Sequence, residues 1–517
     1  MSRLDLKEIQ AQLQAFKDNP VKEMNRKPAK VVVQNESAFG TAFSVDDIDA
    51  KRYLDAREKV REALLEVVDP DTGDKAPFQA NDNAADLVDD FQYNNLQAMA
   101  DANLTSAKIP ENPWSDDYWA IYQGILGNRY SDPHNPSSRN WRENKDYIDN
   151  NPASAILQSG SVARINALSP SEKYDAIIGD SSGALTQAMW AEGKYYYDNF
   201  GQVETWMGIC HGWAPAAYML ARPTGSVTLS TPDNIPITFY PSDIKSLATL
   251  LWANINTASR FIGGRCNDKN PATDPANGRN ISDDCFDTNP GTWHMTIVNQ
   301  IGVSKRSLVV DVTYDYEVWN QPALSYEYTY VNLNTNQTSN NLADAILEIN
   351  DYRDDPFSRY RSNRTTHIVG IAMSFDYMVE TSPTADATDN PDKDAIYNVR
   401  YLYDLELDSS GNIMGGEWRT NLHPDFIWTP SATGKAVTSY EDQATGSWSQ
   451  ANSPLPSSWQ SAAQQASAQQ RAPLAKIVDQ LLVFSNGEAT DTGDGSNDDN
   501  SDDSTTVDDI IEKIENR

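Results

Sequence analysis

Cys210 stands in a stretch of sequence that suits a reactive thiol. It lies within GICHGWAPAA, where a glycine marks a turn and a short, alanine-rich, apolar run follows. This pattern predicts a helix over 209–221 with Cys210 near its N-terminus. The amide groups and the helix dipole at that place favour a negative charge, and the thiolate is the nucleophilic form of cysteine. Cys210 is therefore the candidate nucleophile; the alternative is an inert cysteine of the core.

A thiol nucleophile needs a base and a group that orients the base. In NPGTWHMTI, a turn signal leads into an apolar run, which predicts that His294 lies at the start of a strand over 294–302. The run LVVDVTYDYEVW predicts a second strand, over 307–319, with Asp311 and Asp315 on one face. Either carboxylate could reach a histidine on the neighbouring strand. His294 is the candidate base, Asp311 the first choice of orienting acid and Asp315 the second.

The remaining histidines are weaker candidates. His211 adjoins Cys210 but is expected to point elsewhere from the helix. His134, His367 and His423 stand in loop or strand contexts that suggest no catalytic partner. No pair of Cys or His residues has the close spacing of zinc ligands, so the residues alone predict no metal site.

Cys266 and Cys285 flank a polar stretch without regular periodicity, GRCNDKNPATDPANGRNISDDCF. A disulfide that closes this loop would offset the missing hydrophobic packing, and it would leave Cys210 as a free thiol. The alternative is two free thiols in a cytosolic protein. The sequence pattern favours the disulfide.

The elements that must position these residues show both helical and strand-like patterns. Apolar residues at helical spacing predict helices over 49–68, 84–100, 182–200 and 473–485. Further strand-like runs lie at 225–239, 325–333, 366–381 and 398–408. A cysteine-bearing helix packed on antiparallel strands is an α+β arrangement. A cysteine on a helix, then a histidine on a strand and a carboxylate on the next strand, is the chain order of papain-like and transglutaminase cores.

Changes in composition divide the 517 residues into four predicted regions. Residues 1–109 form an N-terminal helical region, which is a candidate pro-segment. The sequence becomes aromatic and turn-rich from Pro110, and 110–432 form the predicted catalytic core. Residues 433–485 are rich in Ser, Ala and Gln and end in one helix. The acidic tail, 486–517, begins with a long run of small and acidic residues that has almost no apolar side chains. It is expected to be disordered.

The net charge excludes several classes of function. Against 41 Lys and Arg stand 74 Asp and Glu, which gives a formal charge of -33 and disfavours binding to nucleic acid or anionic membranes. No apolar run approaches the roughly 20 residues that cross a bilayer. The N-terminus MSRLDLKEIQ has no apolar core of a signal peptide. We expect neither nucleic acid nor a membrane as a partner.

Several motifs together point to one family. The run VWNQPALSYEYTY resembles the elicitor segment of secreted oomycete transglutaminases, a family that also occurs in marine Vibrio bacteria. The same order of motifs continues in GICHGWAPAA, DCFDTNPGTWHMTIVNQIG, VVDVTYDYEVWNQP and MGGEWRTNLHPDFIW. These motifs spread over roughly 115–430. The segment departs from the oomycete one at Ala323, Leu324 and Ser325, where the oomycete segment is basic and contains glycine.

The resemblance implies a calcium-dependent enzyme with a papain-like core and an added N-terminal helical region. Such an enzyme joins protein glutamine and lysine side chains by isopeptide bonds, with deamidation as a side reaction when water replaces lysine. Cys210 matches the nucleophile, His294 the base, and Asp311 or Asp315 the acid. The resemblance also implies a secreted or extracellular protein.

Four residues are candidates for substrate binding: Trp206, Trp213, Trp319 and Asn320. Trp206 and Trp213 flank the cysteine and could shield a thioester from water, although buried structural tryptophans are the alternative. Two other functions stay open at this point. A papain-like cysteine protease uses the same three groups, and a non-catalytic secreted elicitor or adhesin would keep only the fold.

Overall fold

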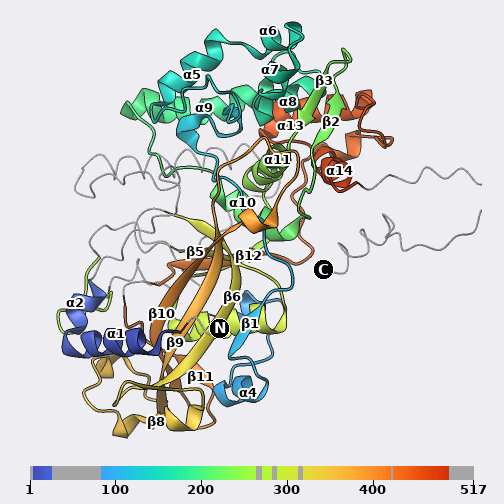
Figure 1. Ribbon diagram of the computed structural model, residues 1–517. Coiled ribbons are helices and arrows are strands. Elements are labelled where there is room, and N and C mark those ends of the chain that lie inside the picture. Colours follow the sequence, from blue (N-terminus) through green and yellow to red (C-terminus); the bar gives the residue numbers. More distant parts are fainter. Residues whose placement is uncertain are drawn as a thin grey trace, which may run out of the picture.

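The computed structural model describes residues 4–25, 83–263, 271–281, 288–312, 318–420 and 423–487. Helices gather at one end of the molecule and a large antiparallel sheet at the other (Figure 1). α10 (Cys210–Met219) lies between them, close to β5 (Val309–Asp311) and β12 (Phe426–Pro430). The prediction of a mixed fold of helices and antiparallel strands is confirmed.

The sheet of the described residues has ten strands, with the main order β11-β10-β9-β6-β5-β12-β4. Its long members are β6 (Asn320–Asn332), β9 (His367–Val379) and β10 (Ala395–Leu407). The shorter ones are β1 (Ser106–Lys108), β4 (Ser259–Gly263), β7 (Gln337–Ser339), β8 (Leu347–Glu348) and β11 (Ile413–Gly415). β6 pairs with β5 over 320–322 and with β9 from Ala323 onward, with a register shift between Ala323 and Ser325. The first residues of β6 thereby reach the helical end of the sheet.

The helical end consists of several elements, among which α11 (Pro241–Asn254) packs directly on α10. They are α5 (Trp141–Asn150), α6 (Ala153–Gln158), α7 (Val162–Asn166), α8 (Pro170–Ile177), α9 (Ala184–Phe200), α11, α13 (Ser457–Gln470) and α14 (Ala475–Ser485), with the hairpin of β2 (Val227–Ser230) and β3 (Pro236–Phe239). α10 and α11 pack closely because Gly212 has no side chain. A Cβ at Gly212 would lie 2.2 Å from the carbonyl oxygen of Thr249 and 2.6 Å from the Cβ of Ala253. This contact fixes the helix that carries Cys210.

Most of the predicted elements that fall on described residues are present. The helix predicted over 182–200 is α9, the one over 209–221 is α10 and the one over 473–485 is α14. The strands predicted over 325–333, 366–381 and 398–408 belong to β6, β9 and β10. In 84–100 the structure has a short 3₁₀ turn, η1 (Ala84–Asp86), and the start of α4 (Leu96–Asp101) instead of one helix. The predicted helix over 49–68, Asp315, Cys266 and Cys285 lie outside the described residues.

The strand predicted over 294–302 is wrong. Residues in this range form α12 (Pro290–Ile297), which continues as a π-helical turn, η5 (Val298–Val303). The start of α12 has the features of a helix N-terminus: the Asn289 side chain accepts from the Gly291 amide at 2.9 Å, and Pro290 occupies the first turn. Nearly every residue of this run is buried, so apolar residues occur on all sides of the helix. The sequence therefore lacks the helical spacing of apolar residues that would have indicated a helix, and its β-branched residues suggested a strand. The strand predicted over 307–319 is shorter, Val309–Asp311, with 313–317 outside the described residues.

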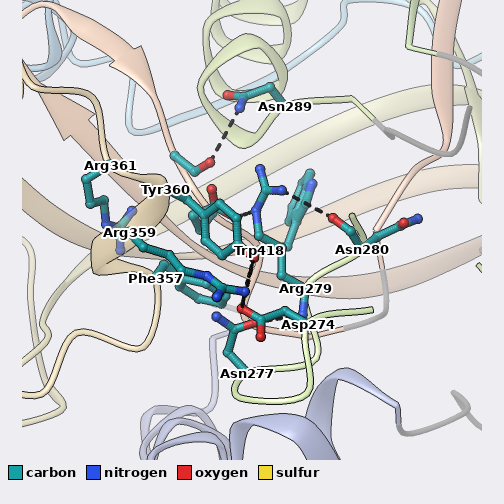
Figure 2. A network of polar contacts seen from close by, with 12 residues as sticks. Asp274, Asn277, Arg279, Asn280, Asn289, Phe357, Arg359, Tyr360, Arg361 and Trp418 are labelled. Atoms are coloured by element: carbon teal, nitrogen blue, oxygen red, sulfur yellow. Dashed lines mark hydrogen bonds and ion pairs between the residues drawn. The ribbon is translucent and has the colours of Figure 1, made fainter. Parts of the chain in front are cut away.

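A polar network holds the segment before α12 against the far end of the sheet (Figure 2). The Arg279 guanidinium donates to Glu417 at 2.7 Å and lies 4.3 Å from the centre of the Tyr360 ring. The Tyr360 hydroxyl donates to Asp274 at 2.9 Å. Asn277 donates to the carbonyl of Pro356 at 2.7 Å. These contacts hold the segment before α12 in place.

Candidate active site

Cys210 is the first residue of α10. The chain reaches it through a close approach to the segment around Tyr118, whose carbonyl accepts from the Ile209 amide at 2.7 Å. A Cβ at Gly208 would lie 2.4 Å from that same carbonyl oxygen, so this position requires glycine. Ile209 is the N-cap residue and provides no side-chain acceptor to the first turn. The first-turn amides of a helix have no intrahelical acceptor, so this end of α10 favours negative charge beside the thiol.

The thiol of Cys210 faces the N-terminal end of β6. Its sulfur lies 3.8 Å from the carbonyl oxygen of Val318 and 3.8 Å from the amide nitrogen Nδ2 of Asn320. Cys210 is 6% exposed and Asn320 4%, whereas Val318 at the rim is half-buried. The cysteine is therefore almost covered, with a partly open rim beside it.

The side chain of Asn320 is held from the other side by β12. The indole nitrogen of Trp428 donates to Oδ1 of Asn320 at 2.8 Å. The two residues come from strands on either side of β5, and the register pairs Val309 with both Pro322 and Trp428. This register brings the Trp428 side chain across β5 to Asn320. The structure thus joins three separate parts of the sequence at the thiol.

Asp311 lies opposite Asn320 in the register of β5 and β6 and is fully buried. Its Oδ1 accepts from the backbone amide of Trp319 at 3.0 Å. The carboxylate thereby supports the segment that faces Cys210. The structure brings the predicted acid to the predicted nucleophile by way of residues 318–320. Asp315, the second choice, lies outside the described residues.

His294 is placed elsewhere. It is fully buried in α12, where Nδ1 lies 2.9 Å from the Tyr403 hydroxyl and its ring centre lies 4.7 Å from that of Tyr328. Burial lowers the pKa of His294 to about 3. Tyr328 and Asn320 are eight positions apart on β6, and a strand rises about 3.3 Å per residue, so their Cα atoms are roughly 25 Å apart. The contacts described for His294 are therefore with aromatic residues of the sheet core, and its role as the base stays a prediction.

His423 lies just before β12, whose Trp428 holds Asn320. The pairing of Ile427 with Val310 places Phe426 opposite Asp311 when it is extended by one residue. His423 lies three residues before Phe426, beyond the paired part of β12, so the register does not fix its distance from Cys210. It is buried and stacks on Trp418, with ring centres 5.0 Å apart and planes at 15°. Burial lowers its pKa to about 4. The sequence offers no signal for this placement beyond the motif that ends in Trp428.

The predicted substrate-binding tryptophans are mostly part of the core. Trp213 is fully buried and donates to the carbonyl of Trp114 at 3.0 Å. Trp206 donates to Glu204. Trp319 is 1% exposed and packs on Tyr118 with ring centres 5.3 Å apart. These contacts match the structural alternative for Trp206 and Trp213, and the half-buried Trp428 is the tryptophan whose indole points at the site.

The described ranges contain no group of three or more His, Cys, Asp or Glu residues placed to hold a metal ion. The donors at the thiol are an amide, a carbonyl and a carboxylate already engaged by a backbone amide, which do not fit the six to eight oxygen ligands that calcium takes. No helix within these ranges is long and apolar enough to cross a membrane.

Comparison with known proteins gives two matches. A family model described as transglutaminase elicitor matches residues 85–443. A solved structure, the GP42 transglutaminase from Phytophthora sojae, is similar with 21% sequence identity and a TM-score of 0.43, over 65% of this chain and 87% of that one. No curated protein matches the chain.

Proposed function

The chain belongs to the transglutaminase elicitor family, and from that premise we propose that it is a protein-glutamine γ-glutamyltransferase with Cys210 as nucleophile. Its product is an isopeptide bond between a glutamine and a lysine of protein substrates. The observation that carries the proposal is the position of Cys210: the first residue of α10, nearly buried, with an amide nitrogen of Asn320 3.8 Å from its sulfur. A cysteine with this setting resembles an activated nucleophile more than a core residue.

The reaction follows from two acyl transfers. The Cys210 thiolate attacks the carboxamide carbon of glutamine, and the tetrahedral oxyanion collapses with loss of ammonia, which takes up one proton. The product is a thioester. A lysine amine then attacks the thioester carbon, loses one proton and releases the thiolate. Water in place of lysine gives glutamate, which is the deamidation side reaction.

The proton acceptor in this proposal is His423. Its place in the segment that leads into β12, whose Trp428 holds Asn320, supports this choice. A buried histidine with a pKa of about 4 is neutral at pH 7 and can accept a proton. Asp311 supports the segment that faces the thiol and is the carboxylate of the proposed site.

Three further expectations remain part of the proposal. The resemblance implies a papain-like core, calcium dependence and secretion, and no calcium ligand is assigned because the described residues offer no fitting set. The mechanism above uses no metal. A chelator in the assay tests the calcium expectation directly.

The experiment that tests the function is incorporation of a fluorescent primary amine into a glutamine-rich protein, with calcium or chelator. We expect labelling by the wild type and none by Cys210→Ala. Labelling that persists in the Cys210→Ala variant would overturn the proposed nucleophile. Peptide cleavage without labelling would make the protein a papain-like protease, and neither reaction would favour a non-catalytic elicitor or adhesin.

A further inference from the structure

We propose that the Asn320 side-chain amide stabilises the oxyanion formed when Cys210 attacks glutamine, and that Trp428 holds this amide in its donating orientation. The inference rests on the proposed function. It assigns a catalytic role to Asn320, because its amide lies next to the reacting sulfur, and a positioning role to Trp428.

The orientation of the amide follows from the chemistry of the indole. The Trp428 nitrogen carries a hydrogen and can only donate, so the atom of Asn320 that lies 2.8 Å from it must be the oxygen. The other terminal atom of the side chain is then the NH₂ nitrogen, which lies 3.8 Å from the sulfur of Cys210. A rotation of the amide by half a turn would place NH₂ against N–H and leave two donors facing each other. One hydrogen bond therefore fixes which end of Asn320 faces the thiol.

Burial makes this arrangement effective. Asn320 is 4% exposed and Cys210 6%, so water competes little for the donor, and hydrogen bonds to developing charge are stronger in such a setting. A carboxamide attacked by the sulfur forms its C–S bond at about 2 Å, which places the oxyanion within a few ångströms of that sulfur. A donor beside the sulfur lies where this oxygen develops. Asn320 donates a hydrogen bond and transfers no atom.

The start of α10 complements this donor. Cys210 opens a helix of ten residues, and its amide lies in the first turn, where the helix dipole is positive. An oxyanion between the first turn of α10 and the amide of Asn320 would meet a donor on each of two sides. The sheet and the helix thus contribute separately to the same charge.

The test compares two reactions of the same thiol. Ammonia release from a glutamine peptide passes through an oxyanion, whereas alkylation by iodoacetamide displaces iodide at a saturated carbon and forms none. We expect Asn320→Ala to lower kcat for ammonia release by roughly 100- to 1,000-fold. Its alkylation rate should stay within a few fold of the wild type across the pH profile.

Trp428→Phe keeps the ring and removes the indole donor, so the amide loses its fixed orientation. We expect roughly tenfold lower kcat for ammonia release with little change in KM, and an unchanged alkylation profile. Trp448→Phe is the matched control, because it removes an indole donor to the Ser453 carbonyl at 3.0 Å, outside the proposed site. That variant should release ammonia at the wild-type rate.

Three outcomes distinguish the explanations. If Asn320→Ala slows alkylation and ammonia release equally, the residue supports the thiol or the fold, and the oxyanion role is overturned. Full ammonia release by folded Asn320→Ala would also overturn it, while the proposed function would stand. A wild type that releases no ammonia would instead refute the proposed function itself. Circular dichroism of each variant establishes that it is folded.

Discussion

Burial keeps both His294 and His423 neutral near pH 7, because it lowers their pKa values to about 3 and about 4. A neutral imidazole can accept a proton, so this property does not separate the two candidates. Position does. His294 bonds Tyr403, and His423 stacks on Trp418, which packs on the same Tyr403. Only His423 stands just before the strand whose Trp428 contacts the site.

Substitution of the two histidines tests this difference. His423→Gln should lower kcat for ammonia release by about 100-fold or more, the usual contribution of a general base. His294→Gln should leave kcat of the folded protein within a few fold. Steady-state rates on variants with native circular dichroism provide the measurement. Loss of activity in folded His294→Gln, with an active His423→Gln, would restore His294 as the base.

His294 also carries a pH prediction. Its pKa in the folded state, about 3, is lower than the ordinary value of 6.5, so the unfolded chain binds the proton more tightly. The associated stability is fully present above pH 6.5 and is lost as the pH falls toward 3. The free energy of unfolding of His294→Gln should therefore decline less between pH 6.5 and 4 than that of the wild type. Urea titrations at the two pH values measure the difference, and equal declines would contradict the buried neutral state.

At the scale of elements, the packing of α10 on α11 determines the position of Cys210. Gly212 allows this approach, since an added Cβ would meet the Thr249 carbonyl at 2.2 Å. Backbone atoms on α11 cannot move aside as a flexible side chain can. The helix must therefore shift when the glycine is replaced.

Gly212→Ala should thus impair both stability and catalysis. We expect a loss of about 1–3 kcal/mol in the free energy of unfolding, as for overpacked cores, and a lower kcat because Cys210 moves from Asn320. Gly415→Ala in β11 is the control, because its added Cβ would have no neighbour closer than 3.7 Å. Denaturation curves and ammonia release test both variants. A Gly212→Ala protein with wild-type stability would contradict the packing described.

Sequence patterns predicted the elements whose periodicity is unambiguous. The strand-like runs of β6, β9 and β10 and the helical spacing of α9 were sufficient, although β9 is buried along nearly its whole length. α12 was predicted as a strand because its run of apolar and β-branched residues is buried on nearly all sides. The stronger signal was local, in the Asn289 cap and Pro290 of its first turn.

For the site, sequence patterns supplied candidates whose catalytic roles stay predictions. Cys210 and Asp311 followed from local patterns, and Asn320 was named as a substrate-binding candidate. The contact between Asn320 and Trp428 joins positions 108 residues apart, and no local pattern encodes such a pair.

At the scale of the whole molecule, the N-terminal helix packs far from the thiol. α1 (Leu6–Asp18) places Ile9 and Leu13 on Val331, Ala372 and Leu402 of the sheet (Figure 1). Val331 is eleven positions along β6 from Asn320, near the opposite end of that strand. The described part of the N-terminal region therefore supports the sheet and does not cover Cys210.

A substitution in the contact between α1 and the sheet tests whether α1 only supports the sheet or also inhibits the enzyme. Leu13→Ala should weaken the docking of α1 and speed amide hydrogen exchange in that helix, because a buried leucine contributes about 2–5 kcal/mol. Specific activity should not change. Gln10→Ala on the exposed face of α1 is the control for both readouts. A rise in activity with Leu13→Ala would indicate that α1 inhibits the enzyme.

The central claim is that Cys210 carries the acyl group of glutamine, and mass spectrometry of the digested protein tests it most directly. The protein is incubated with a glutamine peptide without amine, quenched in acid and digested. We predict an adduct with the mass of the peptide less one ammonia, mapped to Cys210 and removed by hydroxylamine, as expected for a thioester. The adduct should be absent in Cys210→Ala. An adduct on another residue, or substrate turnover by Cys210→Ala, would contradict the account.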